Sequence, residues 1–167
     1  MPFITHRLLP LTRLPLLVAL VTFWPYLLGA QPSWPGFSST TPSAQRNALN
    51  AVQSHVRWLQ NSTHTASGYG RGGYDLVWRQ FQSLRGSFQE FVRTLRPDQL
   101  SNGANDLADL AGGLDILQEA FSNFQNDVAG GLSERWALQN MCRVLDRAAV
   151  VWMQELNRDS NRLRVGW

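Results

Sequence analysis

Residues 102–128 read NGANDLADLAGGLDILQEAFSNFQNDV, and this stretch decides the fold. Its large apolar residues follow one another at alternating intervals of three and four, the a/d seam of a helix that packs against other helices. A strand would show a period of two, which this stretch lacks. The seam consists of Leu107, Leu110, Leu114, Leu117, Phe121, Phe124 and Val128. We therefore predict a long helix whose narrow apolar face must be covered by partner helices.

Three other segments carry seams of the same kind, and short connections follow the second and third of the four segments, which favours antiparallel neighbours. Their apolar residues are Leu49, Val52, Val56 and Leu59 in the first, Val77, Phe81, Leu84, Phe88, Phe91 and Leu95 in the second, and Leu138, Met141, Leu145, Ala149, Trp152, Leu156 and Leu163 in the last. The predicted fold class is all-α, an up-down four-helix bundle with helices near 44–61, 74–96, 102–128 and 134–164.

Glycines mark the expected interruptions of these helices. Residues 61–75, NSTHTASGYGRGGYD, hold four glycines between positions 68 and 73, so we expect a loop between the first and second helices. Gly112 and Gly113 lie inside the third helix but off its seam. Such a pair predicts a kink, a close approach by a neighbouring helix, or a break into two shorter helices.

The first 30 residues have the pattern of a targeting segment. Two arginines, Arg7 and Arg13, precede an apolar run over residues 14–28, and Ala30 supplies a small residue at a cleavage point. The run is shorter than the roughly 20 residues of a membrane-spanning helix. We predict a cleaved signal peptide over residues 1–30, with an uncleaved membrane anchor as the alternative. The expected location is periplasmic or extracellular after cleavage, and membrane-anchored if the segment is kept.

The rest of the chain divides into a short linker and one helical domain. Residues 31–42, QPSWPGFSSTTP, are rich in proline and serine, which is typical of a linker. Residues 43–167 are numerous enough to bury one hydrophobic core. The predicted organisation is therefore 1–30 signal peptide or anchor, 31–42 linker and 43–167 helical bundle domain.

Charge and composition exclude several function classes. All 15 basic residues are arginine, so chemistry that needs a lysine amine, such as a Schiff base, is excluded. The net charge is +3, and it falls to +1 without Arg7 and Arg13, so no nucleic-acid partner is expected. Residues 43–96 hold seven arginines and two acids, whereas residues 97–131 hold six acids and no arginine. We expect complementary faces on neighbouring helices; the alternative is a basic face for an acidic partner or an acidic face for a cation.

Residues that carry catalytic chemistry are scarce. Beyond residue 30 the only histidines are His55 and His64, and neither has the E-x-x-H or H-x-x-x-H spacing of a helical metal site. Cys142 is the only cysteine, which rules out an internal disulfide. Carboxylates are paired at Asp106/Asp109 and at Asp115/Glu119, a spacing that favours a solvated helix face over a weak cation site. We predict no catalytic residue, metal site or cofactor, and lean against an enzyme.

Tryptophan is the unusual abundance, with seven in the chain. Trp58 and Trp136 lie off the seams of their helices, next to Arg57 and Arg135. Exposed tryptophans with an arginine rim are typical of a protein contact surface, so these four residues form the candidate interaction surface. The predicted function is a non-catalytic protein-binding or scaffolding module, exported, with another protein or a second copy as partner. The alternative is a helical bundle that holds a metal, haem or small anionic ligand, a class that includes enzymes.

Overall fold

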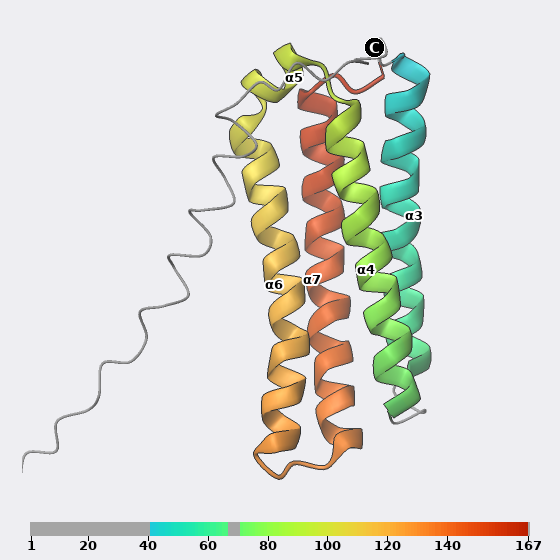
Figure 1. Ribbon diagram of the computed structural model, residues 1–167, viewed down its shortest axis with the longest axis vertical. Coiled ribbons are helices and arrows are strands. Elements are labelled where there is room, and N and C mark those ends of the chain that lie inside the picture. The colour runs from blue at the N-terminus through green and yellow to red at the C-terminus, as the bar shows by residue number, and fades with distance from the viewer. Residues whose placement is uncertain (1–40, 67–70, 167) are drawn as a thin grey trace, which may run out of the picture. The chain divides into compact units, whose positions relative to one another are not determined.

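A computed structural model describes residues 41–66 and 71–166, and within these residues it contains five helices and no strand (Figure 1). The prediction of an all-α fold is thus confirmed. The predicted signal peptide and residues 31–40 of the predicted linker lie outside the described residues. The helices are α3 (Pro42–Ala66), α4 (Arg71–Thr94), α5 (Pro97–Asn102), α6 (Ala104–Ala129) and α7 (Glu134–Arg162).

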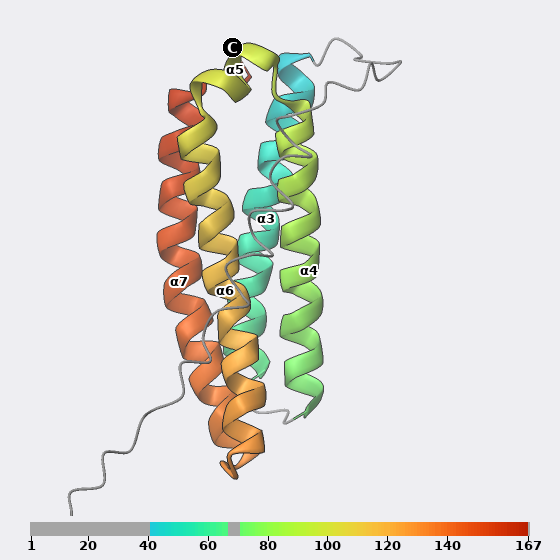
Figure 2. The same cartoon turned by 60° about the vertical axis from the view of Figure 1, so that its left-hand side comes forward.

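The four long helices lie side by side in both views, and each runs opposite to the long helix before it (Figures 1 and 2). Close backbone approach is concentrated between α3 and α4, between α6 and α7, and between α3 and α7. The chain therefore folds as two helical hairpins joined along α3 and α7. None of the helices in the described ranges is both long enough and apolar enough to cross a membrane.

The core is built from the predicted seams. Every seam residue of α4 is buried, as is every seam residue of α7 and of the short stretch after it up to Leu163. In α6 the middle of the seam is buried, from Leu110 to Phe121, whereas Leu107, Phe124 and Val128 are only partly covered. Each fully buried side chain of this size contributes about 1.5–3 kcal/mol to folding. The spacing thus identified the core correctly and overestimated burial towards the ends of α6.

The connection between α3 and α4 is shorter than the predicted loop over residues 61–75. α3 continues to Ala66, and α4 already begins at Arg71. Gly73 explains the difference: a Cβ built on it would overlap the carbonyl oxygen of buried Ala66. The glycine lets the first turn of α4 approach the last turn of α3 closely. The prediction that these glycines form only loop was therefore wrong for Gly72 and Gly73.

Gly112 and Gly113 do not break α6, which runs without interruption through both residues. A Cβ on Gly113 would overlap the indole of Trp152 on α7, whereas a Cβ on Gly112 would meet nothing within 4 Å. Of the three explanations suggested by the sequence, the close approach of a neighbouring helix is the correct one for Gly113. A break into two helices occurs instead at Gly103, between α5 and α6.

Two buried glutamines hold together the end of the structure where α5 lies. The Gln45 side-chain amide donates to the Thr94 carbonyl oxygen (2.9 Å) and to the Gln99 side-chain oxygen (2.8 Å). Its own side-chain oxygen accepts from the Gly166 backbone N–H (3.1 Å), and Gln99 donates to the Leu163 carbonyl oxygen (2.9 Å). These bonds tie α3, α4, α5 and the C-terminal residues to one another.

Candidate functional site

The two tryptophans of the candidate interaction surface are exposed. Trp58 on α3 is 53% exposed, and Trp136 in the first turn of α7 is 52% exposed. Arg57 and Arg135 beside them are exposed as well. Neither arginine forms an ion pair in the part of the chain that the structure describes. Each tryptophan is thus paired with a guanidinium group that is available to an approaching partner.

Trp58 is held by the neighbouring turn of its own helix. Its indole meets the His55 ring edge-on, with the ring centroids 4.7 Å apart and the planes at 84°. His55 is half-buried, and its Nδ1 atom is buried without a hydrogen-bond partner. Burial lowers the pKa of His55, so the ring stays neutral at pH 7. The ring that packs against Trp58 is therefore uncharged, and the positive charge beside Trp58 comes from Arg57.

Trp136 is positioned by the cap of α7. Ser133 has an extended backbone, and its hydroxyl oxygen accepts a hydrogen bond from the Trp136 backbone N–H at 3.4 Å. The turn before it contains Gly131, whose φ of +93° favours glycine, and the exposed side chain of Leu132. Leu132 and Trp136 thus give this end of the α6–α7 hairpin an apolar character.

The two tryptophans do not form one continuous surface. Hydrogen bonding of Gln53 to Asn157 (2.8 Å) and the contact of His64 with Asp146 (3.5 Å) set the register of α3 against α7. In this register Trp58 is level with Trp152, because it lies five residues beyond Gln53. Trp136 is sixteen residues before Trp152 on α7, which corresponds to about 24 Å along the helix. The four residues of the candidate surface therefore form two clusters, Arg57/Trp58 and Arg135/Trp136.

The basic residues of α4 and the acidic residues of α6, expected as solvated faces of opposite sign, do not bond each other in the described residues. In the described ranges no ion pair links these helices: Arg85 of α4 bonds the amide oxygen of Gln118 (3.1 Å), and Arg93 bonds Glu90 on its own helix (3.2 Å). Among the described residues, α6 forms an ion pair with α7, between Asp106 and Arg162 (3.4 Å). The arginines of α4 and the carboxylates of α6 thus remain surface charges of opposite sign that do not bond each other.

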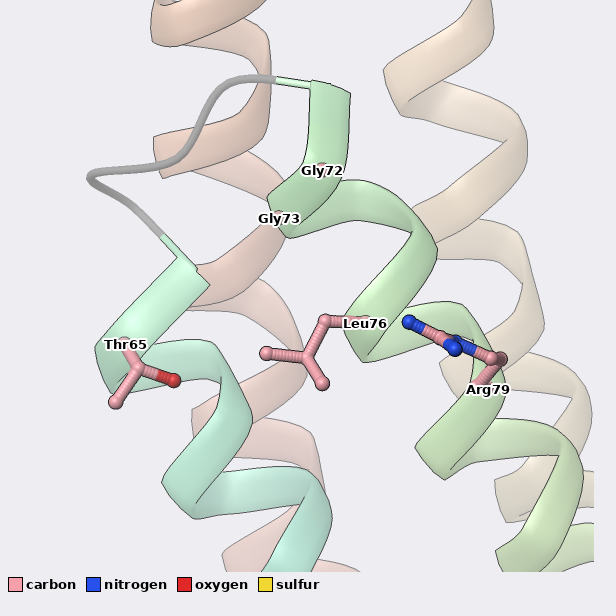
Figure 3. A pocket seen from close by; sticks show the side chains of 5 residues that line it. All are labelled: Thr65, Gly72, Gly73, Leu76 and Arg79. Atoms are coloured by element: carbon pink, nitrogen blue, oxygen red, sulfur yellow. The ribbon is translucent and has the colours of Figure 1, made fainter.

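A shallow hollow of about 450 Å³ lies where α3 ends and α4 begins (Figure 3). The described residues of its lining combine one hydroxyl and one guanidinium group with glycine backbone and an apolar side chain. The residues are Thr65, Gly72, Gly73, Leu76 and Arg79. The Nε atom of Arg79 donates to the Asp75 carbonyl oxygen of its own helix (3.3 Å). The arrangement offers weak contacts to a small anion, and among the described lining residues no acid or base converges on it.

A second hollow, of about 230 Å³, lies between α4 and α6. Aromatic rings fill the space beside it: Tyr74 stacks on Phe124 with centroids 4.7 Å apart, and Trp78 meets Phe121 edge-on at 4.8 Å. The Gln125 side-chain amide donates to the Tyr74 hydroxyl oxygen (3.3 Å). These rings pack on one another and join the two helical hairpins, which indicates a structural role.

Metal and nucleophile chemistry find little support in the described residues. Among them there is no group of three histidine, cysteine or carboxylate side chains placed to hold a metal ion. Burial raises the pKa of Cys142 to about 11, so its thiol is protonated at neutral pH and a poor nucleophile. Asp159 is buried, which no local pattern of the sequence indicates, and its carboxylate accepts a hydrogen bond from Arg158 Nε at 2.8 Å.

Comparison of the chain with protein-family models, with curated proteins and with solved structures found no match. A functional inference therefore depends on the surface and core features of the chain itself.

Proposed function

We propose that this chain is a non-catalytic protein-binding or scaffolding module, built as an up-down four-helix bundle and exported by means of residues 1–30. The observation that supports the proposal is the exposure of Trp58 and Trp136 on a chain whose core is complete without them. Tryptophan and arginine are the side chains most enriched among the residues that dominate protein–protein binding.

The spacing of the two clusters favours a macromolecular partner over a small ligand. They are separated by about 24 Å along the helices, a span that a standard protein interface of roughly 800 Å² per partner can cover. Each tryptophan projects from a helix surface and is absent from the lining of both hollows described above. Arg57 and Arg135 supply the polar edge that surrounds such apolar anchors.

The proposal is tested by purifying the tagged full chain natively from its host and identifying the proteins that accompany it by mass spectrometry. Trp58→Ala and Trp136→Ala should each weaken binding of the protein that the wild-type chain captures, by about tenfold or more. Their thermal unfolding, followed by circular dichroism, should stay close to that of the wild type. Val150→Ala is the matched control, because it shortens an exposed apolar side chain of α7 outside both clusters. Earlier melting of both tryptophan variants with unchanged capture would show that the tryptophans support the fold instead.

The hollow at the α3–α4 junction supports the second candidate function, a bundle that holds a small anion or a cofactor. A visible absorption spectrum and metal analysis of the natively purified protein separate the two functions. A chromophore, or a metal present in stoichiometric amount, would favour the ligand-holding bundle. Isothermal titration with inorganic phosphate tests the anion, with Arg79→Gln as the variant that removes the guanidinium group which the described residues contribute to the lining.

Export is tested separately by mass spectrometry of the N-terminus of the protein recovered from its host. A product that begins near Gln31 supports cleavage of residues 1–30. A full-length chain in the membrane fraction supports the anchor, and a full-length chain in the cytoplasm contradicts export.

A further inference from the structure

A second set of residues with heptad spacing lies on the surface of the α6–α7 hairpin. On α6 the exposed residues Asp109, Gly112, Ile116 and Glu119 follow one another at intervals of three, four and three. On α7 the exposed residues Val144, Arg147 and Val151 follow one another at intervals of three and four, and exposed Arg158 lies two turns beyond Val151. Ile116 is 60% exposed, Val144 45% and Val151 54%. This spacing puts each set on one face of its helix, so both helices carry an outer seam besides the buried one.

The two outer seams lie next to each other. Ile116 is one turn beyond Gly113, whose backbone packs on Trp152, and Asp109 is one turn beyond Asp106, which pairs with Arg162. Because α6 and α7 are antiparallel, three residues forward from Gly113 correspond to three residues back from Trp152. Ile116 is therefore level with Ala149, between Val144 and Val151.

The outer seams have opposite charge. The α6 seam contains Asp109 and Glu119, and no arginine occurs anywhere in α6. The α7 seam contains Arg147 and Arg158. Asp109, Glu119 and Arg147 take part in no ion pair within the described residues, whereas Arg158 bonds Asp159 through Nε. The surface thus has an acidic edge, a basic edge and exposed apolar side chains at its centre.

We propose that a second copy of this chain docks on the α6–α7 surface, related to the first by a two-fold axis parallel to the helices. This rotation places α6 of one copy opposite α7 of the other at the same height. Glu119 then faces Arg147 of the second copy, and Ile116 enters between its two exposed valines. Gly112 is exposed on this surface and has no side chain, and the chain's own atoms leave the space above its Cα open.

The charge pattern favours a two-fold axis parallel to the helices over one that runs across them in the plane of the interface. A two-fold axis perpendicular to the helices would place α6 opposite α6, and the acids of the two copies would repel each other. The parallel axis makes every contact occur twice, as required of a symmetric dimer interface. The proposal uses neither Trp58 nor Trp136, so it stands or falls separately from the proposed function.

The experiment is sedimentation of the full chain over a range of concentrations in low salt, with charge-reversal variants. Glu119→Arg and Arg147→Glu should each weaken the wild-type dimer about tenfold or more, because like charges then face each other across the axis. An equal mixture of the two variants should regain the dimer. In a dimer of one variant with the other, arginine faces glutamate at both contacts across the axis. Each variant chain by itself still carries two like charges at positions 119 and 147, so the mixture restores attraction only between chains.

Asp75→Arg and Arg93→Glu are the matched controls, since they make the same charge changes on exposed residues of α4. Both should sediment as the wild type does. Residues 1–30 are present in every sample, so association through them does not distinguish the variants. A wild-type chain that stays monomeric up to roughly 100 μM overturns the proposal. So does dimerisation unchanged by either reversal, or a variant mixture that remains monomeric while each variant is folded by circular dichroism.

Discussion

The indole Nε1 of Trp152 donates a hydrogen bond to the backbone carbonyl oxygen of Leu110, 2.7 Å away. This bond joins α7 to α6 inside the core, and the ring that makes it lies directly on the backbone of Gly113. Phe88 of α4 meets the same ring edge-on at 5.6 Å. Three helices therefore converge on one tryptophan, and the glycine is what allows its ring to fit.

This contact predicts opposite effects for two adjacent glycines. Gly113→Ala should lower the free energy of unfolding by about 1–3 kcal/mol, because the new Cβ overlaps the indole of Trp152. Gly112→Ala should raise it by up to about 1 kcal/mol, because alanine is the better helix former and the added carbon meets open space. Urea denaturation of both variants measures the difference. Equal stabilisation by the two substitutions would contradict the packing of Trp152 on Gly113.

The buried glutamine network predicts a second asymmetry. Gln45→Leu removes four hydrogen bonds and leaves the Gly166 N–H and the Gln99 amide short of partners, so it should cost about 1–3 kcal/mol. Gln53→Leu is the control, because Gln53 bonds exposed Asn157 at the surface; its effect should stay within about 0.5 kcal/mol. Denaturant unfolding compares them. If both variants lose the same stability, the network does not hold this end of the structure together.

Burial of His55 predicts that stability decreases in mild acid. Protonation would place an N–H on the buried Nδ1, which has no acceptor, and burial keeps the pKa of His55 below 6.5 in the folded state. Below pH 6.5 the unfolded chain therefore binds more protons than the folded one, and the free energy of unfolding falls as the pH falls. His55→Gln should reduce this decrease between pH 7.5 and 5.5. His64→Gln should keep it, because His55 is retained.

Burial of Cys142 predicts the opposite trend in alkali. The pKa of the thiol is about 11 in the folded state and 9.0 in the unfolded chain, so the unfolded chain loses this proton first. The free energy of unfolding should therefore fall as the pH rises from 9.0 towards 11. Cys142→Ala should lose less stability over the same range. A direct check is the reaction with a disulfide reagent at pH 8, which should be slow for the native chain and fast in urea.

Heptad spacing was enough to predict the core. Phe81, Leu84 and Leu117 are buried because residues at intervals of three and four occupy one side of a helix whatever partner covers it. The same logic placed Trp58 and Trp136 outside the seams, and both are exposed. Whether they form one surface was not predictable, since that depends on the register of α3 against α7.

Glycines were the main source of error. Local composition around Gly72 and Gly73 predicts a flexible connection, yet both lie in α4. Only Gly73 packs against the last turn of α3, whereas a Cβ on Gly72 would meet nothing within 4 Å. The buried state of Gln45 and Gln99 gave no local signal either. Glutamine is normally exposed, and the partners that satisfy these two side chains include residues more than 50 positions away in the chain.

By itself the sequence determined the helical class of the described residues, the identity of most core positions and the absence of lysine chemistry. All three follow from residue type and spacing along the chain, which are local properties. Only the tertiary structure decided the two-cluster layout of the exposed tryptophans, the outer seams of the α6–α7 hairpin, and the fit of Trp152 on Gly113. These depend on the height at which one helix stands against another, and that height is set by contacts between residues far apart in sequence.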